Sequence, residues 1–396
     1  MAAPVLTNYH VDYTSTIPAN AGDLVKLFVR RRNGTQSGDP SRPVLMLHGR
    51  SVPALAGFDL QYKKYSWAEE LAKAKFDVFV MELQGSGLST RPRMDDPKNV
   101  SPAPSQRKLL VPHPNASPYT GPVDYAAQLN NSRSDWGEVD RVVDFILDKT
   151  GASKVDLIGW SAASQVFGPY AIQHPGKVRS LFLLAPIFPP HGRASASGTD
   201  FDEPVPLPVS TPGSFDYPMT VATKAGVESA WQKDLKCPDQ REPGMLDEVW
   251  KAIMATDAVG AGWGPEVGTA SAPRAEGLSR IRNSYWWGWN STTVPLHGVL
   301  GGTVPVCLVY GENDTIVNTD PNLGLLYFSV PELYAKIPGA KKLMLRIACA
   351  GHQAPWERVA NDVHTMSEHW LRFGKVEGVT TGSYYRDSDG ALTPME

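Results

Sequence analysis

The chain lacks a strong excess of charge of either sign. Its 38 lysines and arginines stand against 41 aspartates and glutamates, which gives a formal net charge of -3 at pH 7. No long run of one sign occurs, whereas clustered basic residues are the usual mark of proteins that bind nucleic acid or anionic membranes. We therefore expect no nucleic acid and no membrane surface as a partner.

Long apolar runs and cysteines are scarce as well. No run approaches the roughly 20 apolar residues that span a bilayer, and residues 1–20 show no charged start followed by an apolar block. We therefore expect neither a membrane span nor a signal peptide. Cys237, Cys307 and Cys349 are few, odd in number and far apart, and two of them lie in apolar, strand-like runs. Reduced, buried thiols are the expected state, and a cytoplasmic location fits best.

Dense apolar runs alternate with segments of helical periodicity. Such alternation is typical of an α/β architecture with a mainly parallel sheet. The expected strands cover residues 23–32, 43–48, 77–83, 155–158, 178–187, 304–310 and 342–347, and residues 374–396 suggest a terminal hairpin. The expected helices cover residues 66–74, 135–149, 163–173, 331–336 and 355–373.

The most informative stretch is KVDLIGWSAAS, residues 154–164. A short apolar strand breaks at Gly159, presents Ser161, and continues from Ala163 as a helix. A serine on a sharp turn between strand and helix needs very small residues two positions before and two positions after it, because larger side chains would collide there. The pattern is G-x-S-x-A, one methyl group away from the commoner G-x-S-x-G, and predicts an exposed serine nucleophile.

The order of further residues supports this interpretation. His48 and Gly49 follow an upstream strand, Asp314 follows a downstream strand, and His352 comes later still. The order serine, aspartate, histidine is that of the α/β-hydrolases, and residues 23–374 resemble the branch of that superfamily with a serine nucleophile and a cap. A serine at position 161 argues against the branches that need a carboxylate nucleophile.

The resemblance implies an α/β-hydrolase fold, a mainly parallel eight-stranded sheet flanked by helices. Residues 1–187 and 304–396 would form the core, with a long loop over residues 85–131 that drapes over the active-site end. Residues 188–303 interrupt the sheet pattern and would form an inserted, mainly helical cap.

A serine hydroxyl is a weak nucleophile unless a base accepts its proton and a third group orients that base. We assign Ser161 as nucleophile, His352 as general base and then acid, and Asp314 as the orienting carboxylate. Glu312 and Asp320 are the rivals for the last role. His352 follows a late strand and precedes the closing helix, where the resemblance expects the base.

A tetrahedral intermediate also needs hydrogen-bond donors for its oxyanion. The backbone N–H groups of Ala162 and Arg50 are the expected donors, and His48 is expected to hold the loop. The Arg50 side chain has two possible positions. It could point into the pocket and favour an anionic or polar substrate group, or it could reach out to solvent.

The segment 188–303 holds six of the eleven tryptophans. Large aromatic side chains pack cores as readily as they line pockets. Candidate substrate contacts are Trp160, Tyr285, Trp286, Trp287 and Trp289. We expect a carboxylesterase or lactonase acting on a medium-sized, largely apolar, possibly cyclic molecule, without metal or organic cofactor. Acyl transfer, carbon–carbon bond hydrolysis and a non-catalytic binding protein are the alternatives, and the oligomeric state is left open.

Overall fold

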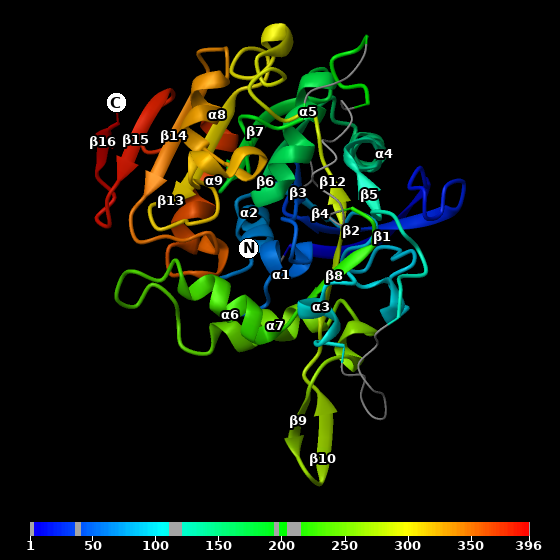
Figure 1. Ribbon diagram of the computed structural model, residues 1–396. Helices are drawn as coiled ribbons and strands as arrows, with labels where there is room; N and C mark the ends of the chain where they lie inside the picture. Colours follow the sequence, from blue (N-terminus) through cyan, green and yellow to red (C-terminus); the bar gives the residue numbers. More distant parts are fainter. Residues whose placement is uncertain (1–3, 36–40, 111–120, 194–197, 204–214, 396) are drawn as a thin grey trace.

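A ten-stranded sheet forms the centre of the molecule (Figure 1). The computed structural model describes residues 4–35, 41–110, 121–193, 198–203 and 215–395. The strand order is β1-β2-β4-β3-β6-β7-β13-β14-β15-β16. The strands are β1 (Val5–Thr14), β2 (Leu24–Asn33), β3 (Pro43–Leu47), β4 (Asp77–Met81), β6 (Val155–Trp160), β7 (Val178–Leu184), β13 (Val306–Gly311), β14 (Lys342–Ile347), β15 (Gly382–Arg386) and β16 (Leu392–Pro394).

Neighbouring strands are parallel from β4 through to β15, and antiparallel at the β1–β2–β4 and β15–β16 ends. The α/β-hydrolase architecture expected from the sequence is confirmed, with two differences in the sheet. The seven strands expected from the apolar runs correspond to β2, β3, β4, β6, β7, β13 and β14, and the C-terminal hairpin adds β15 and β16, so the sheet has ten strands and not eight. In addition, β1 forms where the sequence suggested no strand, because its partner β2 supplies ten consecutive paired positions.

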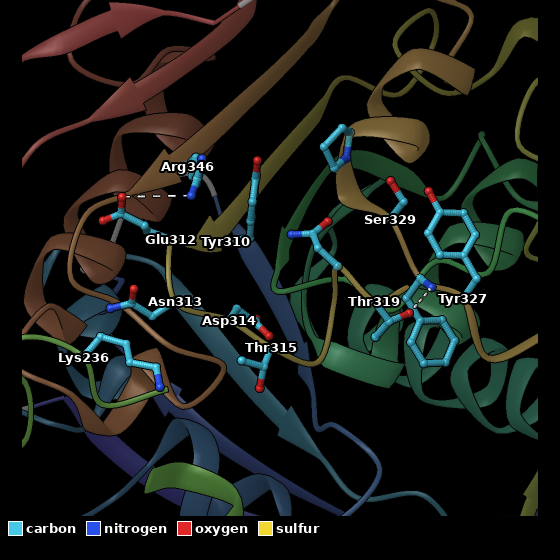
Figure 2. Close-up of a pocket in the computed structure, with 13 residues that line it drawn as sticks. Lys236, Tyr310, Glu312, Asn313, Asp314, Thr315, Thr319, Tyr327, Ser329 and Arg346 are labelled. Carbon is cyan, nitrogen blue, oxygen red and sulfur yellow. Dashed lines mark hydrogen bonds and ion pairs between the residues drawn. The ribbon is translucent and has the colours of Figure 1, made fainter. Parts of the chain in front are cut away.

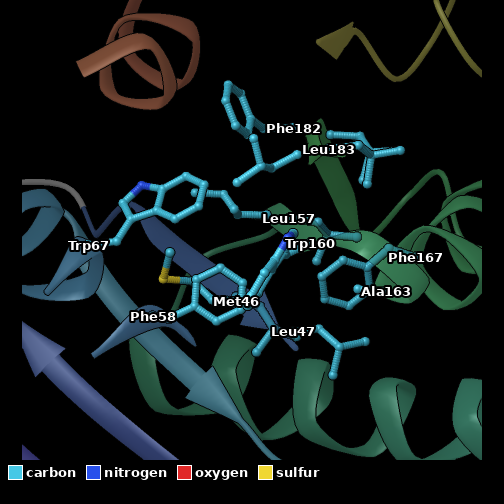
Figure 3. Close-up of a cluster of buried hydrophobic side chains, with 14 of the residues drawn as sticks. Met46, Leu47, Phe58, Trp67, Leu157, Trp160, Ala163, Phe167, Phe182 and Leu183 are labelled. Atoms are coloured by element: carbon cyan, nitrogen blue, oxygen red, sulfur yellow. The ribbon is translucent and has the colours of Figure 1, made fainter. Parts of the chain in front are cut away.

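Helices cover both faces of the sheet. Helix α2 (Trp67–Lys73) packs against α9 (Ala360–Phe373), and α4 (Ser132–Thr150) packs against α5 (Ser164–Gln173). Adjacent residues of a strand point to opposite faces, and in β7 Phe182 meets Trp67 of α2. The next residue, Leu183, lies on the other face beside the elbow. Figure 3 shows Trp67 with Phe182, and the side chains of the elbow helix apart from them.

Local signals in the sequence explain where these helices begin and end. Ser66 accepts a hydrogen bond from the Glu69 N–H and starts α2, with acidic residues in the first turn and Lys73 in the last. Asn131 and Ser134 form a reciprocal capping box at the start of α4. Gly151, at φ 69°, ends that helix in the left-handed conformation that glycine tolerates best.

The segment between β7 and β13 combines helices and strands. Its described residues hold α6 (Lys224–Gln232), α7 (Met245–Met254) and five short strands. This content corrects the expectation of a mainly helical insertion. The strands are β8 (Met219–Ala222), β9 (Glu266–Thr269), β10 (Ala272–Ala275), β11 (Ser279–Arg282) and β12 (Ser284–Tyr285). The β9–β10 hairpin projects away from the body of the molecule (Figure 1). Within the described residues, no helix is both long and apolar enough to cross a bilayer.

A disulfide joins this insertion to the loop after β14. Cys237 and Cys349, 112 positions apart in the sequence, are bonded with a Cα–Cα distance of 5.6 Å. The expectation of reduced thiols is therefore wrong for these two residues, although Cys307 is a buried free thiol as expected. A cytoplasmic location therefore loses the support of reduced thiols, because disulfides are rare in the cytosol.

Removing this cross-link should destabilise the fold. It closes a loop of more than a hundred residues, and loss of a native disulfide typically costs on the order of 2–5 kcal/mol. We expect dithiothreitol, or the double change Cys237→Ser and Cys349→Ser, to lower the free energy of unfolding in urea by about that amount. Dithiothreitol should not affect the double variant further. Equal stability of oxidised and reduced wild type would contradict the prediction.

Candidate active site

Ser161 lies on a strained turn directly after β6. Its φ is 58°, in the left-handed region that residues other than glycine rarely adopt. A Cβ built on Gly159 would lie 3.1 Å from Leu183 Cδ2 and 3.2 Å from Ala163 Cβ, both tighter than ordinary contacts. The turn therefore has room for a methyl group at position 163 only because position 159 has none, which explains the G-x-S-x-A pattern.

The loop after β3 packs tightly against the serine. A Cβ on Gly49 would lie 3.1 Å from Ser161 Cβ and 3.5 Å from its Oγ. His48 is buried, and burial lowers its pKa to about 3, so the ring is neutral. Its Nδ1 donates to the Gly49 carbonyl over 2.6 Å, and its Nε2 accepts from the Leu83 N–H over 3.5 Å. His48 thus holds the loop that carries Arg50.

The structure brings three of the candidate residues into one hydrogen-bonded chain. Ser161 Oγ lies 2.8 Å from His352 Nε2, and His352 Nδ1 lies 2.9 Å from Asp314 Oδ2. The other oxygen of Asp314 accepts the backbone N–H groups of Ile316 and Val317, at 2.9 and 3.1 Å. These two backbone hydrogen bonds fix the carboxylate so that its Oδ2 faces the imidazole.

The rival carboxylates lie in other environments. Glu312 accepts from the Tyr385 hydroxyl and lies 4.0 Å from Arg346, and Asp320 accepts the backbone N–H of Asn322 at the start of a short helical turn. Within the described residues neither carboxylate contacts His352, so Asp314 alone of the three candidates meets the histidine.

Asp234, just beyond α6, organises the two loops that carry this chain. Its Oδ2 accepts the His352 N–H over 2.9 Å, and its Oδ1 accepts both the N–H and the hydroxyl of Thr315. Trp160 Nε1 donates to the His352 carbonyl over 3.0 Å. Sequence reasoning missed Asp234, because it lies in the insertion without a motif around it.

The electrostatic surroundings favour a charged imidazole. Burial works to lower the pKa of His352, but the carboxylate of Asp314 outweighs it, and Asp234 and Glu357 act in the same direction. The net effect is a pKa above the usual 6.5. A base of raised pKa accepts a proton more readily and stabilises the imidazolium that proton transfer creates.

Ser161 faces an apolar cavity of about 340 Å³, called here the near chamber. His352, Arg50 and Ala162 line it together with residues of the insertion, Ala222, Val227 and Ala230. A second cavity of about 520 Å³, the far chamber, is lined by aromatic and aliphatic residues together with several polar ones. Four residues line both chambers: Arg50, Gln165, Trp286 and Phe328. Ser101 and Ala103, from the described part of the loop over residues 85–131, also border the far chamber.

The candidate aromatic residues divide by position. Trp160 lines the near chamber, Trp286 lines both, and Trp287 and Trp289 line the far chamber while remaining 3% and 2% exposed. Trp287 and Trp289 therefore pack in the core and also form part of the cavity wall. Tyr285 lines neither chamber, and its ring packs against Trp287 and under the guanidinium of Arg193 at 4.1 Å.

A larger, open depression of about 650 Å³ lies at the ends of β13 and β14 (Figure 2). It includes Asp314 but neither Ser161 nor His352. Figure 2 shows Glu312 and Arg346 paired with one another in its wall, at 4.0 Å. We place the candidate site in the near chamber, because that cavity contains both the serine and the histidine.

Comparisons with known proteins agree with this fold. The family model described as the alpha/beta hydrolase fold matches residues 42–224, which include Arg50 and Ser161. A serine hydrolase from the polyaromatic-hydrocarbon-degrading bacterium Cycloclasticus zankles is 14% identical, with a TM-score of 0.50 over 93% of this chain and 98% of that chain. A thermophilic esterase from Thermogutta terrifontis is 16% identical, with a TM-score of 0.47 over 92% of this chain and 98% of that one.

No curated protein matches the sequence. The likeness to the solved structures concerns the fold, since the identities are low. With the family match over residues 42–224 and the sheet order described above, it shows that this chain has the α/β-hydrolase fold.

The elbow predicts a coupled pair of substitutions. Gly159→Ala would place a methyl group against Ala163 and Leu183, and overpacking of this kind costs about 1–3 kcal/mol. Ala163→Gly in the same chain should restore part of that loss. The free energies of unfolding of the four proteins in this double-mutant cycle measure the coupling. Strictly additive effects would show that the two positions do not share the space inferred here.

The pH dependence of any turnover should report His352. A general base works when neutral, so kcat/KM should rise with pH through a midpoint above 6.5. Asp314→Asn should lower that midpoint and cost roughly 10⁴-fold in kcat, the loss typical of an orienting carboxylate. Asp234→Asn should lower the midpoint with a smaller loss of rate. A midpoint at or below 6.5 in the wild type would contradict the prediction.

Proposed function

We propose that this protein is a serine hydrolase that cleaves the ester or lactone bond of a medium-sized, largely apolar molecule. The observation that carries the proposal is the hydrogen-bonded chain from Ser161 through His352 to Asp314 at an apolar cavity. A serine on a strained turn, with a base in contact and that base oriented by a carboxylate, is the arrangement that acyl transfer to serine requires.

In this mechanism His352 removes the proton of Ser161 as Oγ attacks the acyl carbon. The resulting imidazolium then donates that proton to the leaving group, and an acyl-enzyme forms. Water attacks the acyl-enzyme with His352 as base again, which releases the acid and restores the serine. The backbone N–H groups of Ala162 and Arg50, which line the same chamber, are the proposed donors to the oxyanion.

The two chambers suggest the size of the substrate. Together they offer a short apolar space beside Ser161 and a wider aromatic space beyond Arg50. Trp160, Trp286, Trp287 and Trp289 are the proposed contacts, and flat or cyclic groups suit such walls. We further propose that residues 188–303 act as the cap over a core of residues 1–187 and 304–396, since the insertion supplies walls to both chambers.

A fluorophosphonate probe tests the nucleophile directly. We expect a single covalent adduct on the wild type, measured by intact mass, and none on Ser161→Ala. Ser51 provides a matched control, because it lines the same chamber but has no hydrogen bond to His352. Ser51→Ala should still form the adduct. An adduct that persists in Ser161→Ala, or its absence from folded wild type, would refute the proposed nucleophile.

A further inference from the structure

Arg50 lies where the near and far chambers meet. It follows Gly49 on the loop that packs against Ser161, and its side chain lines both chambers. The other residues shared by the chambers are Gln165, Trp286 and Phe328. A substrate that occupies both chambers therefore lies beside Arg50.

The arginines beside Arg50 are all paired with carboxylates. A narrow cleft behind the loop is lined by Arg50, Arg91, Arg280 and Arg282. Arg91 and Arg280 both bind Asp257, at 3.2 and 2.6 Å, and Arg280 also reaches Asp95. Arg282 lies 3.0 Å from Asp135. Each of these three positive charges is balanced within the protein.

Arg50 differs from its neighbours, because its guanidinium has no hydrogen-bond or ion-pair partner among the residues that the structure describes. The residue is solvent-exposed where it lines the two chambers, so its guanidinium is open to a ligand. Desolvation by nearby protein lowers its pKa, Tyr217 raises it, and the positive charge of Arg282 lowers it further. An accessible guanidinium without a partner in a cavity wall can form charge-assisted hydrogen bonds with an anionic group of a ligand.

Gln165 supplies a second unpartnered polar group at the same junction. It is the second residue of α5, only 8% exposed, and no described contact satisfies its amide. Because the surrounding walls are mainly apolar or aromatic, Arg50 and Gln165 together form a small polar site between two apolar spaces. Convergent polar groups in an otherwise apolar pocket are what fix the orientation of a ligand.

We propose that the substrate carries a carboxylate, which binds Arg50 and Gln165 at the junction of the two chambers. The scissile acyl bond then lies in the near chamber and an apolar or aromatic body lies in the far chamber. The planar fork of the Arg50 guanidinium fits a carboxylate with two parallel hydrogen bonds, and the Gln165 amide can donate a further one. This inference rests on the proposed function, since it names the substrate class of the same site.

Matched esters test the inference. Two series of aryl esters, with the carboxylate on the acyl side or on the leaving-group side and at graded distances, are each paired with the neutral carboxamide of the same shape. The wild type should favour the carboxylate in at least one series by roughly 10- to 100-fold in kcat/KM, the value of a charged hydrogen bond. Arg50→Gln keeps the backbone N–H, and the carboxylate-to-carboxamide ratio should fall to near one.

The ratio of kcat/KM for the carboxylate to kcat/KM for the carboxamide is taken within each protein, so a general loss of rate cancels. An Arg50→Gln enzyme of low activity therefore still reports whether the carboxylate is preferred. Arg193→Gln is the matched control, because Arg193 lines the far chamber but its guanidinium stacks on Phe215 and Tyr285, at 4.9 and 4.1 Å. It should change the ratio far less. An equal fall in both variants, a ratio near one in the wild type, or a preference that survives Arg50→Gln would overturn the assignment.

Failure of this inference can be separated from failure of the proposed function. Labelling of Ser161 by the fluorophosphonate probe reports the nucleophile whatever the substrate is. Arylalkanoates should slow that labelling at lower concentrations than their carboxamides in the wild type, and this difference should disappear in Arg50→Gln. Labelling without any such difference would refute the carboxylate site alone, whereas no labelling of folded wild type would refute the proposed function.

Discussion

The geometry of this molecule depends on one strained turn. At Ser161 the chain leaves a buried strand and enters a helix with φ at 58°, and the space around it is so limited that a methyl group at Gly159 would press against Leu183 and Ala163. Folding must supply the free energy for this conformation, and the core that flanks β6 does so. The loops after β3, β13 and β14 end at the same edge of the parallel sheet, so the turn, the histidine and the carboxylate meet there.

Much of this arrangement could be predicted from the sequence, because it follows from local patterns. Dense apolar runs marked the parallel strands, Ser66 marked the start of α2, and the small residues around Ser161 marked the elbow. The meeting of Ser161, Asp314 and His352 followed from their order along the chain, since parallel strands bring their carboxyl ends together. Their catalytic roles remain a prediction.

Other features depend on contacts between distant segments, which no local pattern records. The bond between Cys237 and Cys349 joins two segments that lie 112 residues apart in the sequence, and cysteine spacing alone does not indicate pairing. Asp234 is an ordinary carboxylate by sequence, and only the fold brings it to the backbone of His352. Strands β8 and β11 of the insertion pair with each other across a long intervening segment, and β1 forms because β2 accepts it.

The contacts of Asp234 and the disulfide have a common consequence for the site. Both connect the segment after α6 to the loop that carries His352, so the insertion supports the base as well as lining the cavity. On the other side of the site, Arg50 has two proposed roles, one for its backbone N–H and one for its side chain. Its N–H faces the developing oxyanion in the proposed mechanism, whereas its side chain would bind an anion that is present throughout the reaction. Binding of the substrate anion by the Arg50 side chain stabilises substrate and transition state equally, which lowers KM and leaves kcat unchanged. It accelerates the chemical step only if it also orients the acyl group towards Ser161.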